Sequence, residues 1–131
     1  MFSIIDVRGR EPAPGRNILI VEDERLVSWS LTKTLEKAGY CVCVAETGER
    51  AREYLAHRRF DLVITDVNLP SVNGYEIAAA LDPAIPVIII SAGPELPPKG
   101  TEAQLRSFLE KPFCLDEVTE LVGTLLPQSG G

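Results

Sequence analysis

The stretch Ile18–Glu24, ILIVEDE, decides how this chain folds. Four apolar residues lead directly into three consecutive carboxylates. A short continuous apolar run is typical of a strand covered on both faces, as in a parallel sheet. Carboxylates gathered at the end of such a strand repel one another unless a cation lies among them. The stretch therefore predicts a buried strand that ends at an acidic site.

The rest of the chain alternates between strand-like and helix-like segments. The strand-like runs are NILIV (17–21), CVCVA (41–45), DLVIT (61–65), PVIII (86–90) and SFLE (107–110). The segments between them carry apolar residues at helical spacing, and we expect Gly39 to end the first helix and Thr47 to cap the second. This alternation predicts an α/β fold with a doubly wound, five-stranded parallel sheet.

The domain organisation follows from length and composition. The 131 residues suit one domain. Residues 1–16 mix proline, glycine and charge, which indicates a flexible N-terminal arm before a folded domain at 17–127 and a disordered tail at 128–131. The segment GPELPPKG (93–100) cannot be helix interior, so we expect a fourth helix that is short or missing, with at most a turn or two in TEAQLR (101–106).

Composition excludes several classes of function. The net charge of −6 argues against a general electrostatic grip on nucleic acid, and no apolar run is long enough to span a membrane. The three cysteines lack framework spacing, which indicates free thiols in a reducing cytoplasm. The single histidine, His57, is expected at a solvated helix end, so zinc and Ser-His or Cys-His chemistry lose most of their support.

Polar side chains follow the strands in order. Glu22 and Asp23 follow the first, Asp66 the third, Ser91 the fourth and Lys111 the fifth. The carboxyl ends of parallel strands meet at one edge, where ligands bind in such sheets. Oxygen ligands suit Mg²⁺, and a lysine and a hydroxyl suit a phosphoryl group. The set predicts a phosphoryl-transfer site with Asp66 as the candidate nucleophile.

Each of these residues has an ordinary interpretation when taken alone. An aspartate at a strand end is usually a turn residue or a helix cap, and Glu24 is interpreted as a solvated acid of the first helical turn. Taken alone, Ser91 is an ordinary loop residue with a hydroxyl group. The prediction depends on the matches occurring in order, each just after its own strand.

On these motifs the chain resembles the receiver domain of bacterial two-component response regulators. The matching segments are ILIVEDE, LVITDVNLPSVNG, VIIISA and FLEKPF, and the resemblance runs from about Asn17 to Leu126. It implies the flavodoxin-like strand order 2-1-3-4-5 and a cis Lys111–Pro112 bond. Receiver domains normally place a full fourth helix where this chain has residues 93–100, and this departure affects the family's usual partner surface.

The resemblance also implies roles for the site residues. Asp66 would accept a phosphoryl group from a histidine kinase or phosphotransfer protein. Asp23, Asp66 and the backbone carbonyl of Asn68 would bind Mg²⁺, and Glu22 would hold the ion through water. Ser91 and Lys111 would bind the phosphoryl oxygens after Asp66 is modified.

Phe108 falls where the family has an aromatic residue that switches together with Ser91, the alternative being an ordinary core residue. The implied protein is a cytoplasmic signalling module and not an enzyme beyond its own phosphorylation and dephosphorylation. It would act on an unknown output protein or as a homodimer, without binding DNA directly or binding a membrane.

Three other classes of protein share parts of this pattern. A dehalogenase-like Mg²⁺-dependent phosphatase also uses Asp, Ser or Thr, and Lys at strand ends, but it needs a second acid where this chain has Asn68. A flavodoxin-like cofactor binder needs a phosphate cradle where this chain has Glu22–Glu24, which would repel the phosphate. The third alternative is a degenerate receiver that acts only as a docking module.

Overall fold

A computed structural model describes residues 16–70, 72–92 and 105–126 of the chain, without the side chains of 105 and 106. Its five strands form one parallel sheet in the order β2-β1-β3-β4-β5, which confirms the predicted topology. The strands are β1 (Asn17–Val21), β2 (Cys41–Ala45), β3 (Leu62–Asp66), β4 (Val87–Ser91) and β5 (Leu105–Glu110). The helices in the described residues are α1 (Arg25–Lys37), α2 (Gly48–His57), α3 (Gly74–Ala79) and α4 (Leu115–Leu125).

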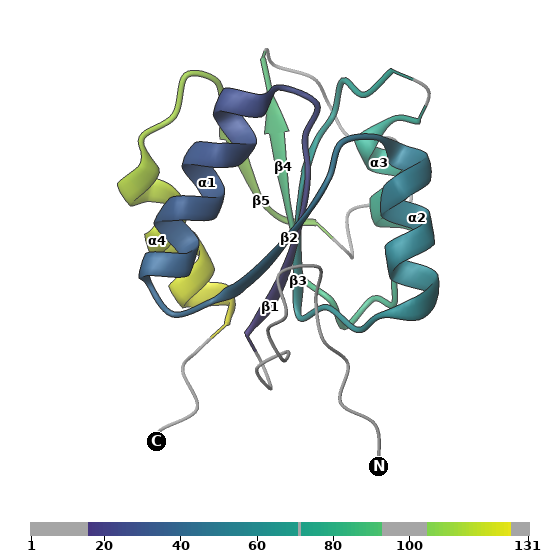
Figure 1. The fold of residues 1–131 in the computed structure, drawn as a ribbon, viewed down its shortest axis with the longest axis horizontal. Coiled ribbons are helices and arrows are strands. Elements are labelled where there is room, and N and C mark those ends of the chain that lie inside the picture. Colours follow the sequence, from purple (N-terminus) through teal and green to yellow (C-terminus); the bar gives the residue numbers. More distant parts are fainter. Residues whose placement is uncertain (1–15, 71, 93–104, 127–131) are drawn as a thin grey trace.

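Helices cover both faces of the sheet, α1 and α4 on one face and α2 and α3 on the other (Figure 1). Successive strand side chains point to opposite faces, so each strand contributes to two cores. On β1, Leu19 and Val21 lie in the core beneath α2 and α3, whereas Ile18 and Ile20 lie in the core beneath α1 and α4. This double coverage explains why the strands are continuously apolar in the sequence.

The helix boundaries follow local signals in the sequence. Gly39 has a φ of +100° just after α1, a left-handed conformation that favours glycine over residues with a Cβ. The hydroxyl of Thr47 accepts a hydrogen bond of 3.1 Å from the backbone N–H of Arg50 and caps α2. Val118 and Val122 are the buried residues of α4. Both predicted caps are therefore confirmed, and His57 lies at the end of α2 as expected.

The boundaries of three strands differ from the sequence-based expectation. β3 and β4 are each shifted by one residue, so that Asp66 and Ser91 are the last residues of their strands. β5 begins at Leu105, and the expectation of a helical turn up to residue 106 was wrong for its last two positions, because they pair with β4. The predictions for the fourth helix at 93–104, the N-terminal arm and the C-terminal tail lie outside the described residues.

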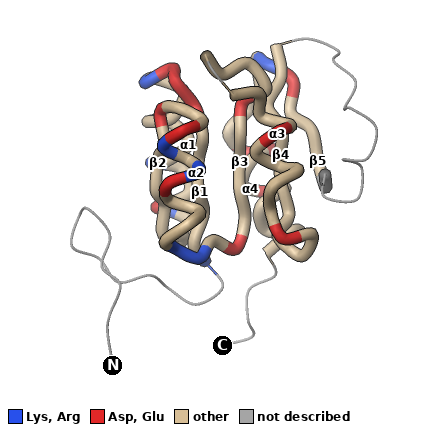
Figure 2. Tube along the Cα trace, turned by 90° about the vertical axis from the view of Figure 1, so that its right-hand side faces the viewer, with Lys and Arg blue, Asp and Glu red and all other residues tan. Residues whose placement is uncertain are grey.

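The charged residues and cysteines behind the compositional arguments can be located in the fold. Figure 2 shows acidic and basic residues interspersed along the described chain. All three cysteines are free thiols. Within the described ranges, no helix combines the length and apolar character that crossing a bilayer requires.

Candidate functional site

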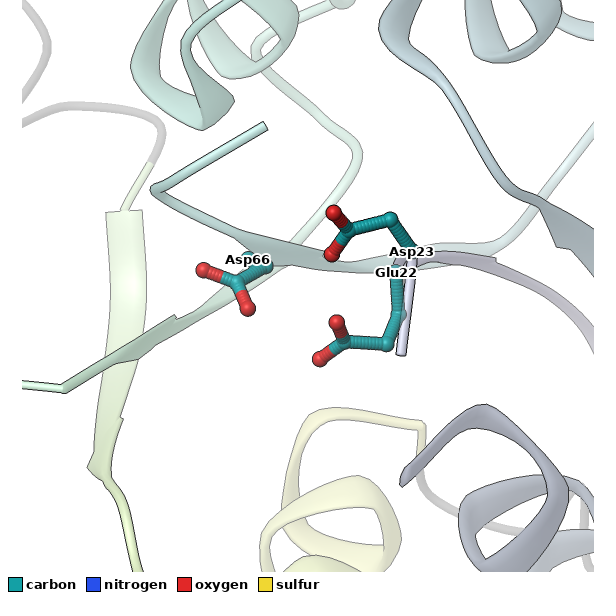
Figure 3. Close-up of side chains that lie close together, drawn as sticks. All are labelled: Glu22, Asp23 and Asp66. Carbon is teal, nitrogen blue, oxygen red and sulfur yellow. The ribbon is translucent and has the colours of Figure 1, made fainter. Parts of the chain in front are cut away.

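Three carboxylates converge where β1 and β3 end. Glu22 and Asp23 follow β1 directly, and Asp66 is the last residue of β3, its neighbour in the sheet. Their side chains point toward a common space (Figure 3), and one oxygen from each lies within 4.8 Å of the others. Glu22 and Asp66 are buried, whereas Asp23 is exposed to solvent. The geometry thus brings together the three acids predicted from the sequence.

Lys111 supplies the opposing positive charge from the end of β5. Its ammonium nitrogen Nζ lies 2.8 Å from Oδ2 of Asp66, 2.9 Å from Oε1 of Glu24 and 3.4 Å from Oε1 of Glu22. Its backbone N–H donates a 2.7 Å hydrogen bond to the carbonyl of Ser91, so the pairing of β4 with β5 sets its position. The Lys111–Pro112 bond is cis, as the family resemblance implied.

Glu24 matches its expected role only in part. Its side chain is solvated, as we interpreted it, but the residue is the N-cap of α1 and not part of the first turn, and its carboxylate pairs with Lys111. The pairing could not be predicted locally, because Lys111 lies 87 residues further along the chain.

The pKa values of Glu22 and Lys111 are both raised, which favours the neutral form of the acid and the charged form of the lysine. Burial raises the pKa of Glu22 to about 7, and the neighbouring Asp66 adds to this rise, while the backbone N–H of Glu24 and the charge of Lys111 oppose it. Partial burial alone would lower the pKa of Lys111, but hydrogen bonds to Asp66 and Glu24 and the charge of Glu22 raise it above its ordinary value. Lys111 is therefore a fixed cation, whereas Glu22 titrates near neutral pH.

The backbone around β3 holds the Asp66 carboxylate in place. Oδ1 accepts a 2.8 Å hydrogen bond from the backbone N–H of Asn68, and the N–H of Val67 donates to the carbonyl of Ile90. A Cβ on Gly74 would lie 2.3 Å from the carbonyl oxygen of Asp66, so only glycine permits this close approach. Sequence reasoning gave Gly74 no role, although the glycine at the end of LVITDVNLPSVNG was a signal for it.

The two predicted switch residues lie on adjacent strands. Ser91 is buried at the end of β4, next to the carboxylate cluster through the pairing of β3 with β4. Phe108 lies on β5 opposite Ile89, with 47% of its surface exposed. This exposure excludes the interpretation of Phe108 as an ordinary core residue.

The donor set fits Mg²⁺. The cluster offers carboxylate oxygens without nitrogen or sulfur, the preference of a hard divalent ion. Oε1 of Glu22 is buried and, among the described residues, accepts no hydrogen bond, although the Lys111 ammonium lies 3.4 Å away. A buried acceptor of this kind ordinarily has a partner, and a hydrated cation between the carboxylates would provide one. Glu22, Asp23 and Asp66 are the residues that would hold it.

Comparison with known proteins identifies the class. The response regulator receiver domain family matches residues 18–123. The chain belongs to this family, whose members are signalling modules of two-component systems. Membership rules out the dehalogenase-like and flavodoxin-like alternatives as family assignments.

Bacterial transcriptional regulators are among its relatives. The transcriptional regulatory protein CusR of Escherichia coli is 37% identical over 114 residues, which cover 83% of this chain and 50% of CusR. The response regulator MprA of a Mycobacterium species is 32% identical over 114 residues, covering 83% of this chain and 50% of MprA. The chain thus spans about half the length of these curated relatives.

Solved structures share the fold. A CheY-like receiver domain protein from Methanospirillum hungatei has a TM-score of 0.78 and 25% identity, covering 85% of this chain and 93% of the other. The response regulator TrrA from Thermotoga maritima, solved in complex with Mg²⁺-BeF, has a TM-score of 0.75 and 29% identity, covering 85% of this chain and 99% of TrrA.

Proposed function

We propose that this chain receives a phosphoryl group on Asp66 from a phosphohistidine and transmits the signal through protein contacts. The observation that carries the proposal is the cluster of Glu22, Asp23 and Asp66 with Lys111 at 2.8 Å from the Asp66 carboxylate. Family membership and the Mg²⁺-BeF complex of TrrA support it.

The residues divide the chemistry between them. An Asp66 oxygen attacks phosphorus, an O–P bond forms, and the P–N bond to the donor histidine breaks. Lys111 offers its ammonium to the phosphoryl oxygens, and the hydrogen bond from Asn68 N–H keeps Asp66 oriented. Mg²⁺, when bound by Asp23, Asp66 and the carbonyl of Asn68 and held through water by Glu22, would neutralise charge that develops on the phosphoryl group.

The modified site would change the protein through Ser91 and Phe108. The Ser91 hydroxyl would bind a phosphoryl oxygen, and the half-exposed ring of Phe108 would move into the space that this shift leaves. The phosphoryl group would bias an equilibrium between two arrangements of Ser91 and Phe108, and output proteins would recognise one of them. This role assigns the chain to the cytoplasm, with residues 17–127 as the signalling domain.

The donor protein would dock beside Lys111. Leu26, Val27, Phe113 and Leu115 line a groove of about 560 Å³ that Lys111 also borders. Leu26 is 81% exposed, and Trp29 is 61% exposed one helical turn further along α1. Apolar side chains this exposed beside a charged site are typical of a partner surface. The occupant that we propose is the donor surface that carries the phosphohistidine, because it must bring phosphorus to Asp66.

Phosphorylation by a small-molecule phosphodonor tests the proposal without a kinase. Intact-mass measurement should show one phosphoryl group per chain in the presence of Mg²⁺ and almost none with a chelator. The label should be sensitive to hydroxylamine, as an acyl phosphate is. A chain that takes no phosphoryl group under any Mg²⁺ concentration would instead be a docking module, and sustained turnover of phosphate esters would indicate a phosphatase.

A further inference from the structure

Glu24 uses its side chain in an unusual way for its position. It is the N-cap of α1, a position where a Ser, Thr, Asp or Asn side chain ordinarily accepts a hydrogen bond from the backbone of the first turn. The Glu24 side chain makes no such bond. Its Oε1 lies 2.9 Å from Nζ of Lys111, although 62% of the side chain is exposed to solvent.

Lys111 and a divalent cation would compete for the same oxygens. Lys111 pairs with Asp66 at 2.8 Å and lies 3.4 Å from Glu22, and both acids belong to the carboxylate cluster that would hold the ion. Glu24 is the partner of Lys111 that stands outside this cluster. An entering cation would therefore displace the ammonium from Asp66 and Glu22 but leave its contact with Glu24 available.

We propose that Glu24 is a positioning residue that holds the Lys111 ammonium at the edge of the site while a divalent cation occupies the carboxylate cluster. Glu24 thereby reduces competition between the two cations and keeps Lys111 within reach of an incoming phosphoryl group. The part that concerns the phosphoryl group rests on the proposed function, whereas the part that concerns the cation is measured separately.

The first experiment measures Mg²⁺ affinity by calorimetry. Glu24→Gln should weaken binding roughly 3- to 10-fold, because Lys111 then pairs more strongly with Asp66 and Glu22. Glu46→Gln is the matched control, since Glu46 is an exposed acid after β2 at the same edge of the sheet. Equal affinities of the two variants would overturn the proposal.

A second variant separates a contact through Lys111 from a general charge effect. In a Lys111→Met background, Glu24→Gln should leave Mg²⁺ affinity unchanged, because the residue through which Glu24 acts is gone. The same loss in both backgrounds would mean that Glu24 acts only as a distant negative charge, and the proposal would be wrong.

Phosphorylation by a small donor provides the third readout. Glu24→Gln should raise the Mg²⁺ concentration needed for half-maximal rate by the same 3- to 10-fold and change the rate at saturating Mg²⁺ much less. If wild-type chain binds Mg²⁺ but takes no phosphoryl group, the proposed function fails while the cation result still decides the role of Glu24. If wild type is phosphorylated and Glu24→Gln behaves like Glu46→Gln, only the role of Glu24 fails.

Discussion

The two ends of the parallel sheet use the same residue types in opposite ways. Before β3, Oδ2 of Asp61 accepts hydrogen bonds from the backbone N–H of Asn17 at 2.9 Å and from its side-chain Nδ2 at 3.2 Å. After β3, Asp66 faces two other carboxylates and a lysine. Asp61 thus links β1 and β3 through neutral donors, whereas Asp66 lies in a group of three carboxylates with one ammonium.

The cations show the same contrast. The guanidinium of Arg58 lies over the rings of Tyr54 and Phe60 and donates to Sγ of Cys43 at 3.3 Å. Lys111 instead lies among three acids. Charges with neutral partners stabilise the fold and can be predicted to be chemically inert. The acids around Lys111 also repel one another, which costs stability, and such a cost is typical of a binding site.

The largest expected difference between the two ends is in phosphorylation. Asp66→Asn should abolish labelling by a small phosphodonor, because an amide cannot form the acyl phosphate. Asp61→Asn, the matched change at the other end of the same strand, should be labelled like wild type. Intact mass and peptide mapping measure both. Persistent labelling of Asp66→Asn at another residue would show that the carboxylate cluster does not define the acceptor.

Much of this contrast could be predicted from sequence. In a parallel sheet, residues that follow successive strands meet at one edge, so Glu22, Asp23 and Asp66 could be placed together from strand positions alone. The contact between Glu24 and Lys111 could not, because it depends on side-chain reach across two elements distant in sequence. The requirement for Gly74 was also hidden, since it arises from a loop folding back onto the Asp66 carbonyl.

Stability as a function of pH gives the second contrast. The pKa of Glu22 is about 7 in the folded chain against an ordinary 4.5, so its protonated form stabilises the fold fully below pH 4.5 and this stabilisation is lost as the pH rises through 7. Glu22→Gln mimics the neutral form. It should be more stable than wild type at pH 8 by on the order of 2–3 kcal/mol.

Urea unfolding without divalent ions at pH 5 and pH 8 measures this effect. The difference between Glu22→Gln and wild type should shrink strongly at pH 5, where most of the glutamate is already protonated. Added Mg²⁺ should also narrow the difference at pH 8, because it stabilises only the chain with the full set of acids. An equal difference at both pH values would contradict the raised pKa of Glu22.

Metal affinity gives the third contrast. Asp23→Ala should weaken Mg²⁺ binding by about tenfold, because it removes an exposed carboxylate that points into the cluster. Asp82→Ala removes an exposed acid near the other end of the sheet, whose Oδ1 accepts a 2.9 Å hydrogen bond from the N–H of Ala84. Calorimetry should give Asp82→Ala the affinity of wild type, and unchanged binding in Asp23→Ala would remove Asp23 from the proposed ligands.

The smallest expected effect concerns the end of the sheet where Asp61 bonds to Asn17, which we call the structural end, in contrast to the functional end that holds the carboxylate cluster. Asp61→Ala removes the acceptor for both donors of Asn17, and Asn17 is only partly buried, so water can replace part of what is lost. The free energy of unfolding should fall by about 1 kcal/mol, the usual cost of losing such a bond. The loss should be the same with and without Mg²⁺, because the Asn17–Asp61 contact lies at the opposite end of β3 from the carboxylate cluster. A loss that Mg²⁺ enlarges or abolishes would show that the two ends are coupled through β3, and the division between a structural end and a functional end would no longer hold.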